Sequence, residues 1–199
     1  MSDLLSVAVL GSTGYVGQQL VDLLSKHPKI KINFLGSENF VNKKISDIDK
    51  QIQKTDLPII NFNKNFEPKG FDLVFLCLPH GISHEYVKKL FNKITIIDLS
   101  ADFRLDSENI YEENYNTKHS CANLLKNFTY SLPEENKELI KKSSNLSIPG
   151  CYPTSILTPL IPLLKNNLVK SDDIIIDSKS GYSGAGKKFD LKKIIKNNQ

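Results

Sequence analysis

The sequence predicts an α/β protein whose core is a doubly wound parallel β-sheet. The first observation is that apolar runs of strand length alternate with segments of helical periodicity, as in successive β-α-β units. The second is a glycine-rich turn between the first apolar run and the first helical segment. The third is an ordinary globular composition, because 40% of the 199 residues are hydrophobic and 24% are charged.

The elements of the first 150 residues follow from apolar spacing. Near-continuous apolar runs favour buried parallel strands over residues 4–11, 30–37, 71–79, 94–100 and 145–148. Helical spacing, or acidic residues behind a proline, favours helices over residues 15–27, 83–91 and 133–142. A polar, lysine-rich stretch separates the second and third strands. The polar residues 105–131 predict a long irregular loop.

The remaining residues predict the start of a further folding unit. Residues 154–168 are apolar enough for a buried helix, which Pro159 and Pro162 should kink or divide. The isoleucine-rich residues 172–180 predict a strand that is central in its sheet. Residues 180–188 form a glycine-rich loop, and a lysine-rich helical end follows them.

Charge and cysteine content narrow the classes of function. The net charge is +4, and the 25 lysines are scattered rather than gathered in a stripe, so no nucleic-acid partner is expected. Three cysteines without framework spacing (Cys77, Cys121 and Cys151) indicate a reducing compartment, and we expect a cytoplasmic protein. Residues 1–10 lack the features of a signal peptide, and no run is long enough for a membrane span.

The glycine-rich turn predicts a dinucleotide site. Gly11, Gly14 and Gly17 follow the first strand and open the first helix. Such a turn lets the backbone approach a pyrophosphate and directs helix N–H groups at it. The end of the second strand should meet the adenine ribose, and there Ser37, Glu38, Lys43 and Lys44 leave the choice between NAD and NADP open.

Two other classes of function, nucleotide hydrolysis and short-chain dehydrogenation, can be compared with the sequence. Residues 181–188, GYSGAGKK, match a phosphate-binding loop up to the last position, where Lys188 replaces the hydroxyl residue that such loops need for Mg²⁺. The tyrosines also exclude a short-chain dehydrogenase, because none is followed by lysine four residues later. Nucleotide hydrolysis and that dehydrogenase class are therefore set aside.

A metal site is suggested by the segment CLPHGISH and is also set aside. Cys77, His80 and His84 have plausible ligand spacing, but Cys77 ends a buried strand and no fourth ligand lies nearby. A core cysteine with loop histidines is the better interpretation. We therefore expect no metal.

The segment IPGCYPTS predicts a nucleophile. Cys151 stands directly before a helix, where unpaired N–H groups and the helix dipole stabilise a thiolate. The same N–H groups can hold an oxyanion formed by attack on a carbonyl. Behind a nucleotide-binding domain, such a cysteine suggests acyl reduction through a thioester.

The motifs GSTGYVGQQL, LPHGISH, DLSADFRL, YSLPE, PGCYPT and SGYSGAGKK occur in one order along the chain. In these motifs the chain resembles the N-acetyl-gamma-glutamyl-phosphate reductases, the arginine-biosynthesis relatives of aspartate-semialdehyde dehydrogenase. The resemblance implies a Rossmann-like NADP-binding domain over residues 1–150. It also implies that residues 151–199 begin, without completing, a semialdehyde-dehydrogenase-type α+β substrate domain.

The resemblance implies a role for each matching residue. Cys151 matches the catalytic nucleophile, and Arg104, the only arginine, matches the residue that binds the acyl phosphate, for which a planar cationic fork is suited. Ser37 and Lys44 match positions beside the 2′-phosphate of NADP. The implied cofactor-binding residues are Gly11, Ser12, Thr13, Gly14, Tyr15, Val16, Ser37, Lys44, Pro79, Gly184 and Ala185.

The implied reaction is NADPH-dependent reduction of N-acetyl-L-glutamyl 5-phosphate, a small-molecule acyl phosphate, to the 5-semialdehyde with release of phosphate. A homo-oligomer is expected for full-length members. The chain departs from the family at Ser131 and Ile148, and it ends before the family's catalytic histidine, so it resembles an N-terminal fragment. The alternatives are a catalytically incomplete nucleotide-binding fragment and a related acyl-phosphate reductase of lysine synthesis.

Overall fold

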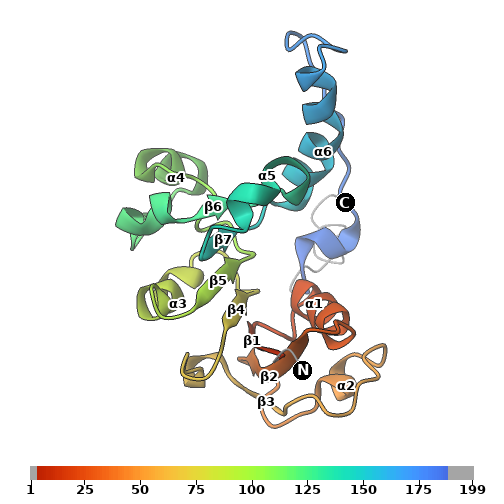
Figure 1. Cartoon of the computed structure of the whole chain (residues 1–199), viewed down its shortest axis with the longest axis vertical. Helices are drawn as coiled ribbons and strands as arrows, with labels where there is room; N and C mark the ends of the chain where they lie inside the picture. The colour runs from red at the N-terminus through yellow and green to blue at the C-terminus, as the bar shows by residue number, and fades with distance from the viewer. Residues whose placement is uncertain (1–3, 188–199) are drawn as a thin grey trace, which may run out of the picture.

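The computed structural model describes residues 4–187, which contain one parallel sheet with helices on both faces (Figure 1). The strands are β1 (Leu5–Leu10), β2 (Ile30–Ser37), β3 (Ile60–Phe62), β4 (Leu73–Leu76), β5 (Thr95–Asp98), β6 (Thr129–Tyr130) and β7 (Asn145–Ser147). The α-helices are α1 (Tyr15–Ser25), α2 (Ile45–Ile48), α3 (Ser83–Leu90), α4 (Glu108–Tyr115), α5 (Pro133–Ile140) and α6 (Cys151–Lys165). Three short 3₁₀ helices are η1 (Asn63–Asn65), η2 (Ala122–Asn127) and η3 (Tyr182–Ala185).

The strand order is β3-β2-β1-β4-β5-β7-β6, and every pairing is parallel. From β1 the chain continues to β2 and β3 on one side and then to β4, β5, β6 and β7 on the other, which confirms the doubly wound fold. In such sheets, ligands bind at the carboxyl ends of the strands, beside the point where the winding reverses. That point lies here between β1 and β4.

The register of the central strands brings four loops to one edge. Leu10 pairs with Leu76, Leu76 with Asp98, and Asp98 with Ser147. These residues end their strands, so the segments that follow them leave the sheet side by side. The sheet therefore groups the glycine turn, the loop after β4, the DLSADFR segment and the loop before Cys151.

Two hydrophobic cores lie on opposite faces of the sheet. On one face, Val7 and Val9 of β1 pack with Val21 of α1. On the other, Ala8 and Leu10 pack with Val87 of α3. The alternation along β1 follows from the two-residue period of a strand. Because both faces are covered, the strands read as continuous apolar runs in the sequence.

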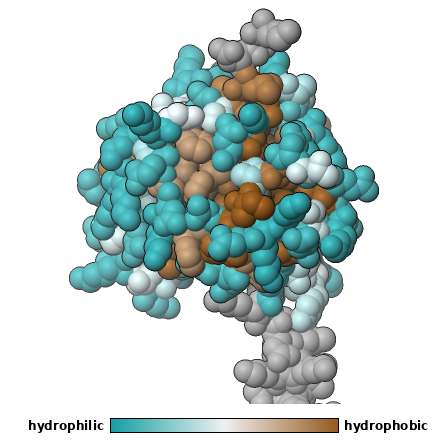
Figure 2. All heavy atoms as spheres, turned by 90° about the horizontal axis from the view of Figure 1, so that it is seen from below, coloured by the Kyte–Doolittle hydropathy of each residue, from teal (hydrophilic) through white to brown (hydrophobic). Residues whose placement is uncertain are grey.

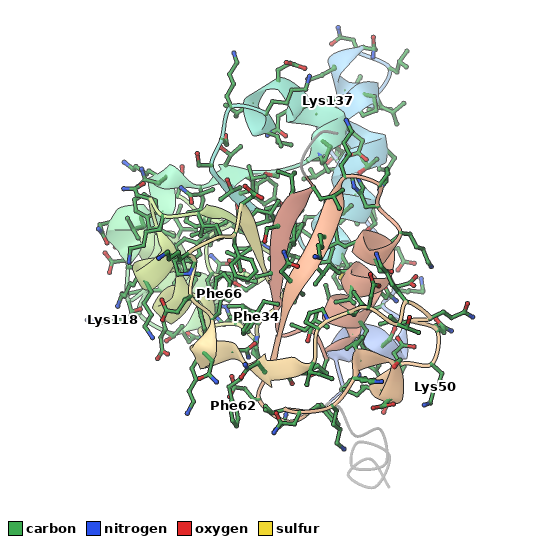
Figure 3. All side chains as sticks on the ribbon, turned by 60° about the horizontal axis from the view of Figure 1, so that its bottom comes forward. Phe34, Lys50, Phe62, Phe66, Lys118 and Lys137 are labelled. Carbon is green, nitrogen blue, oxygen red and sulfur yellow. The ribbon has the colours of Figure 1, made fainter. Side chains whose placement is uncertain are left out.

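Figures 2 and 3 show how side chains are distributed over the molecule. Seen from below, hydrophobic atoms occupy the middle of the face and hydrophilic atoms surround them (Figure 2). Phe34 and Phe66 lie next to each other with ring centroids 5.3 Å apart (Figure 3). Lys50, Lys118 and Lys137 lie on widely separated edges of the molecule (Figure 3), so these cations do not share one patch.

The predicted loop over residues 105–131 is wrong in part. It contains α4, η2 and the short strand β6. Tyr111 of α4 is fully buried, and its hydroxyl group reaches the carboxylate of Asp102 at 3.3 Å. The lysine-rich stretch likewise contains α2 and β3. These elements are short and mostly polar, so long-range packing stabilises them where local apolar spacing gives no signal.

The expectations for the residues after 150 need two corrections. Helix α6 continues through Pro159 and Pro162 without being divided, and none of its residues is buried. Carbonyl groups that lose a partner to proline can therefore be hydrated. Residues 172–180 form no strand, and Ile175 is 93% exposed. A strand needs a ladder partner, and none of the strands between residues 4 and 187 lies beside this segment.

The expected lysine-rich helical end falls on residues 188–199, outside the described residues. In the described part of the chain, no helix is long and apolar enough to cross a membrane.

Candidate active site

Cys151 is the first residue of α6 and is exposed. Gly150 precedes it as the N-cap with extended backbone angles, φ −68° and ψ 165°. Among residues 4–187, no side chain caps this helix end, and its first turn contains no acidic residue. The first-turn N–H groups and the positive end of the dipole therefore surround the thiol without a competing anion.

The other two cysteines lie in environments that disfavour a thiolate. Burial, together with the negative charge of Asp98, raises the pKa of Cys77 to about 12. Burial raises the pKa of Cys121 to about 11, and its thiol contacts the carbonyl oxygen of His84 at 3.9 Å. Cys151 is thus the one exposed thiol in the described part of the chain. Among residues 4–187, it is therefore the cysteine most accessible to a substrate.

Arg104 lies beside the cysteine loop. Its Nε donates a hydrogen bond to the carbonyl oxygen of Ile148 at 2.7 Å, and its Nη2 donates to the carbonyl oxygen of Leu99 at 3.0 Å. A Cβ added at Gly150 would lie 3.0 Å from Nη1 of Arg104. The structure thus brings the only arginine within contact distance of the residue that precedes Cys151.

The glycine turn has the tight geometry that its sequence predicts. Gly11 has a φ of +74°, and a Cβ there would lie 2.2 Å from the carbonyl oxygen of Cys77. A Cβ at Gly17 would lie 2.2 Å from the carbonyl oxygen of Gly11. A Cβ at Gly14, by contrast, would meet only that same oxygen, at 3.5 Å. Gly11 and Gly17 are therefore needed for packing, whereas Gly14 leaves open space at the start of α1.

This open space fits a phosphate group. Gly14 is the N-cap of α1, and within residues 4–187 no side chain caps the helix and no acidic residue occupies its first turn. The first two helical residues are exposed, since 39% of Tyr15 and 56% of Val16 is accessible to solvent. Uncapped helix N–H groups in front of a glycine turn are suited to bind the pyrophosphate of a dinucleotide.

Hydrogen bonds tie the glycine turn to the end of β2. Ser12 donates from its Oγ to the carbonyl oxygen of Gly36 at 2.9 Å. Thr13 Oγ1 lies 2.7 Å from Ser37 Oγ, and both residues are buried. Ser37 is thus positioned at the expected strand end, but its hydroxyl group is engaged by Thr13. Lys44 is exposed and precedes α2.

Asn63 is a residue of this site that the sequence pattern did not indicate. It is 2% exposed, and its Oδ1 accepts a hydrogen bond from the N–H group of Gly11 at 3.0 Å. Its Nδ2 donates to Oε1 of Glu38 at 2.8 Å. Asn63 therefore connects the glycine turn to Glu38, the acidic residue that follows β2. It lies in the polar stretch 38–70, where no periodicity marks it.

Asp102 organises the loop after β4 and was also missed. Its buried carboxylate accepts hydrogen bonds from the N–H groups of Gly81, at 2.8 and 3.0 Å, and of Ser83, at 3.1 Å. His80 Nδ1 lies 2.7 Å from Oδ1 of the same carboxylate. Asp102 thus links the loop that contains the exposed Pro79 to the segment that carries Arg104.

Three histidines gather around Asp102. His84 Nε2 lies 3.7 Å from its Oδ2, and His119 Nε2 lies 2.8 Å from its carbonyl oxygen. Burial is the main cause that lowers the pKa of His84 to about 4, and burial also lowers the pKa of His119. In the described part of the chain, no group of three or more His, Cys, Asp or Glu residues could hold a metal ion.

The second glycine-rich segment, residues 180–187, contacts the glycine turn after β1. Gly184 and Ala185 lie in η3. Lys187 donates from Nζ to the carbonyl oxygen of Thr13 at 2.8 Å and lies 5.1 Å from the ring centroid of Tyr15. This lysine was not among the expected cofactor residues. The G-x-x-x-x-G-K pattern contains it, but that pattern was set aside with the phosphate-binding loop.

Comparison with known proteins agrees with the fold. Residues 6–143 match the NAD binding domain of semialdehyde dehydrogenases, and residues 151–198 match their dimerisation domain. A curated relative from Ehrlichia canis, named N-acetyl-gamma-glutamyl-phosphate reductase, is 48% identical over 94% of this chain and 54% of its own length. An Arabidopsis thaliana relative, named as a probable chloroplastic form of that enzyme, is 41% identical over 91% of this chain and 45% of its own length.

Solved structures share the fold at low sequence identity. Aspartate semialdehyde dehydrogenase II from Vibrio cholerae has a TM-score of 0.62 at 19% identity, covering 94% of this chain and 49% of its own. The Candida albicans enzyme, solved with NADP, has a TM-score of 0.57 at 21% identity, covering 82% and 48%. The chain spans about half the length of the curated relatives it matches. By its two matching domains, the chain belongs to the semialdehyde dehydrogenase family.

Proposed function

We propose that this chain provides the cofactor site and the nucleophile of an NADPH-dependent reductase of N-acetyl-L-glutamyl 5-phosphate. The observation that carries the proposal is the position of Arg104, which is hydrogen bonded to the carbonyl oxygen of Ile148 and would meet a Cβ at Gly150, beside the exposed Cys151. A cationic fork and a thiol on neighbouring loops suit an acyl phosphate, which needs a phosphate ligand and a nucleophile close together. The names of the curated relatives support this substrate.

The residues of the chain perform the acyl transfer. The thiolate of Cys151 attacks the acyl carbon, the carbon–oxygen bond to phosphate breaks, and inorganic phosphate leaves from a thioester. Arg104 neutralises the phosphate charge with its Nη1, since Nε and Nη2 are bound to carbonyl oxygens. The N–H groups of the first turn of α6 stabilise the oxyanion. When bound, the nicotinamide supplies the hydride that releases the semialdehyde and regenerates the thiolate.

The preference for NADPH over NADH is part of the proposal. The exposed Lys43 and Lys44 provide positive charge near the end of β2, and the resemblance to the family favours a 2′-phosphate there. Glu38 opposes it, because a carboxylate repels phosphate and accepts the 2′-hydroxyl of NAD. The amide of Asn63 already engages Oε1 of Glu38, which reduces this opposition.

The setting of the reaction is proposed on two further observations. Cys77, Cys121 and Cys151 are all free thiols, which supports the cytoplasm or another reducing compartment. The match of residues 151–198 to a dimerisation domain supports a homo-oligomer.

A titration of the chain with NADPH and with NADH tests the cofactor proposal. We expect tighter binding of NADPH, and the Glu38→Gln variant should increase the preference by removing a negative charge. Glu67→Gln, which removes an exposed carboxylate elsewhere, is the matched control. Equal or tighter binding of NADH by the unmodified chain would contradict the NADPH preference.

The acyl-transfer proposal is tested without hydride transfer. The chain is mixed with N-acetylglutamyl phosphate in the absence of NADPH and mapped by mass spectrometry. We expect the N-acetylglutamyl adduct on Cys151, and none after Cys151→Ser. An adduct on Cys77 or Cys121 would overturn the assignment.

A chain that binds the nucleotide and forms the thioester but does not turn over is the second candidate. The positions of the histidines favour this candidate. His80, His84 and His119 are grouped with Asp102, and among residues 4–187 no histidine is hydrogen bonded to Cys151. Acyl adduct formation without NADPH oxidation would identify this case. Steady NADPH oxidation would exclude it.

A further inference from the structure

Lys187 makes the longest-range contact with the cofactor turn. It lies 174 positions along the chain from Thr13, yet its Nζ donates to the Thr13 carbonyl oxygen at 2.8 Å. The segment that ends at Lys187 lies beside α1 (Figure 1). Gly186, with a φ of +81°, makes the turn immediately before the lysine. Its left-handed conformation is one that residues with a Cβ rarely adopt.

The charge of this lysine lies beside a second positive feature, the start of α1. Thr13 directly precedes Gly14, the N-cap of α1, so the ammonium group stands near the positive end of the helix dipole. No acidic residue occupies the first turn of α1, and within residues 4–187 Lys187 has no ion-pair partner. Two positive features that face the same open space would both attract a negative group placed between them.

We propose that Lys187 is a cofactor-binding residue whose ammonium group contacts the pyrophosphate of the dinucleotide at the start of α1. The inference rests on the cofactor site of the proposed function and extends it to a residue outside the first domain. One N–H of the ammonium group is bound to Thr13, and two remain for phosphate oxygens. Its approach to the Tyr15 ring, 5.1 Å from the centroid, steadies it above the helix start.

This role also explains the G-x-x-x-x-G-K pattern of residues 181–187. In a phosphate-binding loop, the lysine serves the phosphate held by its own loop. Here the lysine is directed instead to the glycine turn after β1. The pattern thus contributes one cation, and the pyrophosphate is cradled by Gly14 and the uncapped N–H groups of α1.

The test measures dissociation constants for NADPH by fluorescence in the 199-residue chain and two variants. Lys187→Met keeps the length of the side chain and removes its charge, and we expect it to weaken NADPH binding about tenfold. The matched control is Lys179→Met, because Lys179 is an exposed lysine of the same segment that pairs with Asp177. We expect no change in affinity for the control.

Two further measurements distinguish a direct contact between Lys187 and phosphate from an effect on the fold. They are the salt dependence of NADPH affinity and the affinity for a smaller ligand that lacks the pyrophosphate. Because Lys187→Met removes a phosphate contact, the affinity for NADPH should depend less steeply on sodium chloride concentration than in the unmodified chain. Adenosine 2′-monophosphate lacks the pyrophosphate, so its affinity, measured by competition, should be equal in both proteins.

Three results would overturn the inference. Equal NADPH affinities in the Lys187→Met variant and the unmodified chain would exclude the role of Lys187 and leave the proposed cofactor site standing. If the NADPH affinities of both proteins depended equally on salt, the lysine would act only on the fold. If the variant lost as much affinity for adenosine 2′-monophosphate as for NADPH, the lysine would be assigned to the 2′-phosphate. An unmodified chain that binds neither NADPH nor NADH would overturn both this inference and the proposed cofactor site.

Discussion

The Nε of Arg104 lies 2.7 Å from the carbonyl oxygen of Ile148, two residues before Gly150. This bond joins the segment after β5 to the loop after β7, and these strands are neighbours in the sheet. Because Arg104 binds the main-chain carbonyl group of Ile148, the side chain at position 148 can change without loss of this hydrogen bond. Within residues 4–187, the hydrogen bonds that hold the guanidinium beside the cysteine loop are therefore all to main-chain carbonyl oxygens.

Arg104→Lys should weaken both the fold and the acyl-transfer step. A lysine has one donor group on a flexible stem and cannot reach both carbonyl oxygens while presenting a further donor to phosphate. We expect a loss of about 1–3 kcal/mol in the free energy of unfolding, measured with urea. The rate of acyl adduct formation on Cys151 should fall at least tenfold. An adduct rate equal to that of the unmodified chain would show that charge alone suffices.

Iodoacetamide should modify Cys151 much faster than the other cysteines. Cys77 and Cys121 are shielded, and burial raises their pKa values to about 12 and about 11. Peptide mapping after short exposure at pH 8 measures the three rates. The control is the same chain in urea, where all three should react alike. Fast modification of Cys77 in the folded chain would contradict the burial described above.

Gly17→Ala and Gly14→Ala should separate packing from cofactor binding. The added Cβ at Gly17 lies 2.2 Å from a main-chain oxygen, so we expect a loss of about 1–3 kcal/mol in unfolding free energy. At Gly14 the closest atom is at 3.5 Å, and the loss should stay below about 1 kcal/mol. Binding of NADPH should nevertheless weaken in Gly14→Ala, because the methyl group enters the space left for phosphate. Unchanged binding there would place the phosphate elsewhere.

Acid should destabilise the fold through His84. Its pKa falls from the ordinary 6.5 to about 4, chiefly because of burial, while Asp102 opposes this shift and His119, His80 and Lys88 add to it. Between these pH values the unfolded chain binds a proton that the folded chain does not. The contribution of His84 to the free energy of unfolding is therefore fully present above pH 6.5 and is lost as the pH falls toward 4.

The measurement compares unfolding free energies of the unmodified chain and His84→Gln from pH 7 to 4. We expect a smaller decline in the variant, by on the order of 1–3 kcal/mol. Asp98 has a pKa raised to about 6 by burial, so its contribution has the opposite sign and increases stability as the pH falls below 6. Because Asp98 is present in both proteins, the difference between the two curves isolates His84. Parallel curves would contradict the prediction.

Local patterns were sufficient for the central part of the sheet. Strand β2 has the bounds that its apolar run predicts, and α1 and α3 begin where the spacing places them. These segments are buried on one or both faces, so their residues carry the periodicity of the element they form. The glycine turn and the cysteine loop were also evident, because each depends on neighbours within a few positions.

Contacts between distant segments decided the rest. Strand β3, helix α4 and the absence of a strand over residues 172–180 depend on which partner lies alongside, and a sequence window contains no partner. The same holds for Asn63 on Gly11, Arg104 on Ile148 and Lys187 on Thr13. The first two hydrogen bonds arise from strand order and register, which place separate loops at one edge of the sheet, whereas Lys187 reaches the turn from a segment outside the sheet. The parallel sheet and the glycine turn could be predicted from the sequence alone, and the role of Cys151 stays a prediction, whereas the charged side chains that meet the turn and the cysteine loop depend on tertiary packing.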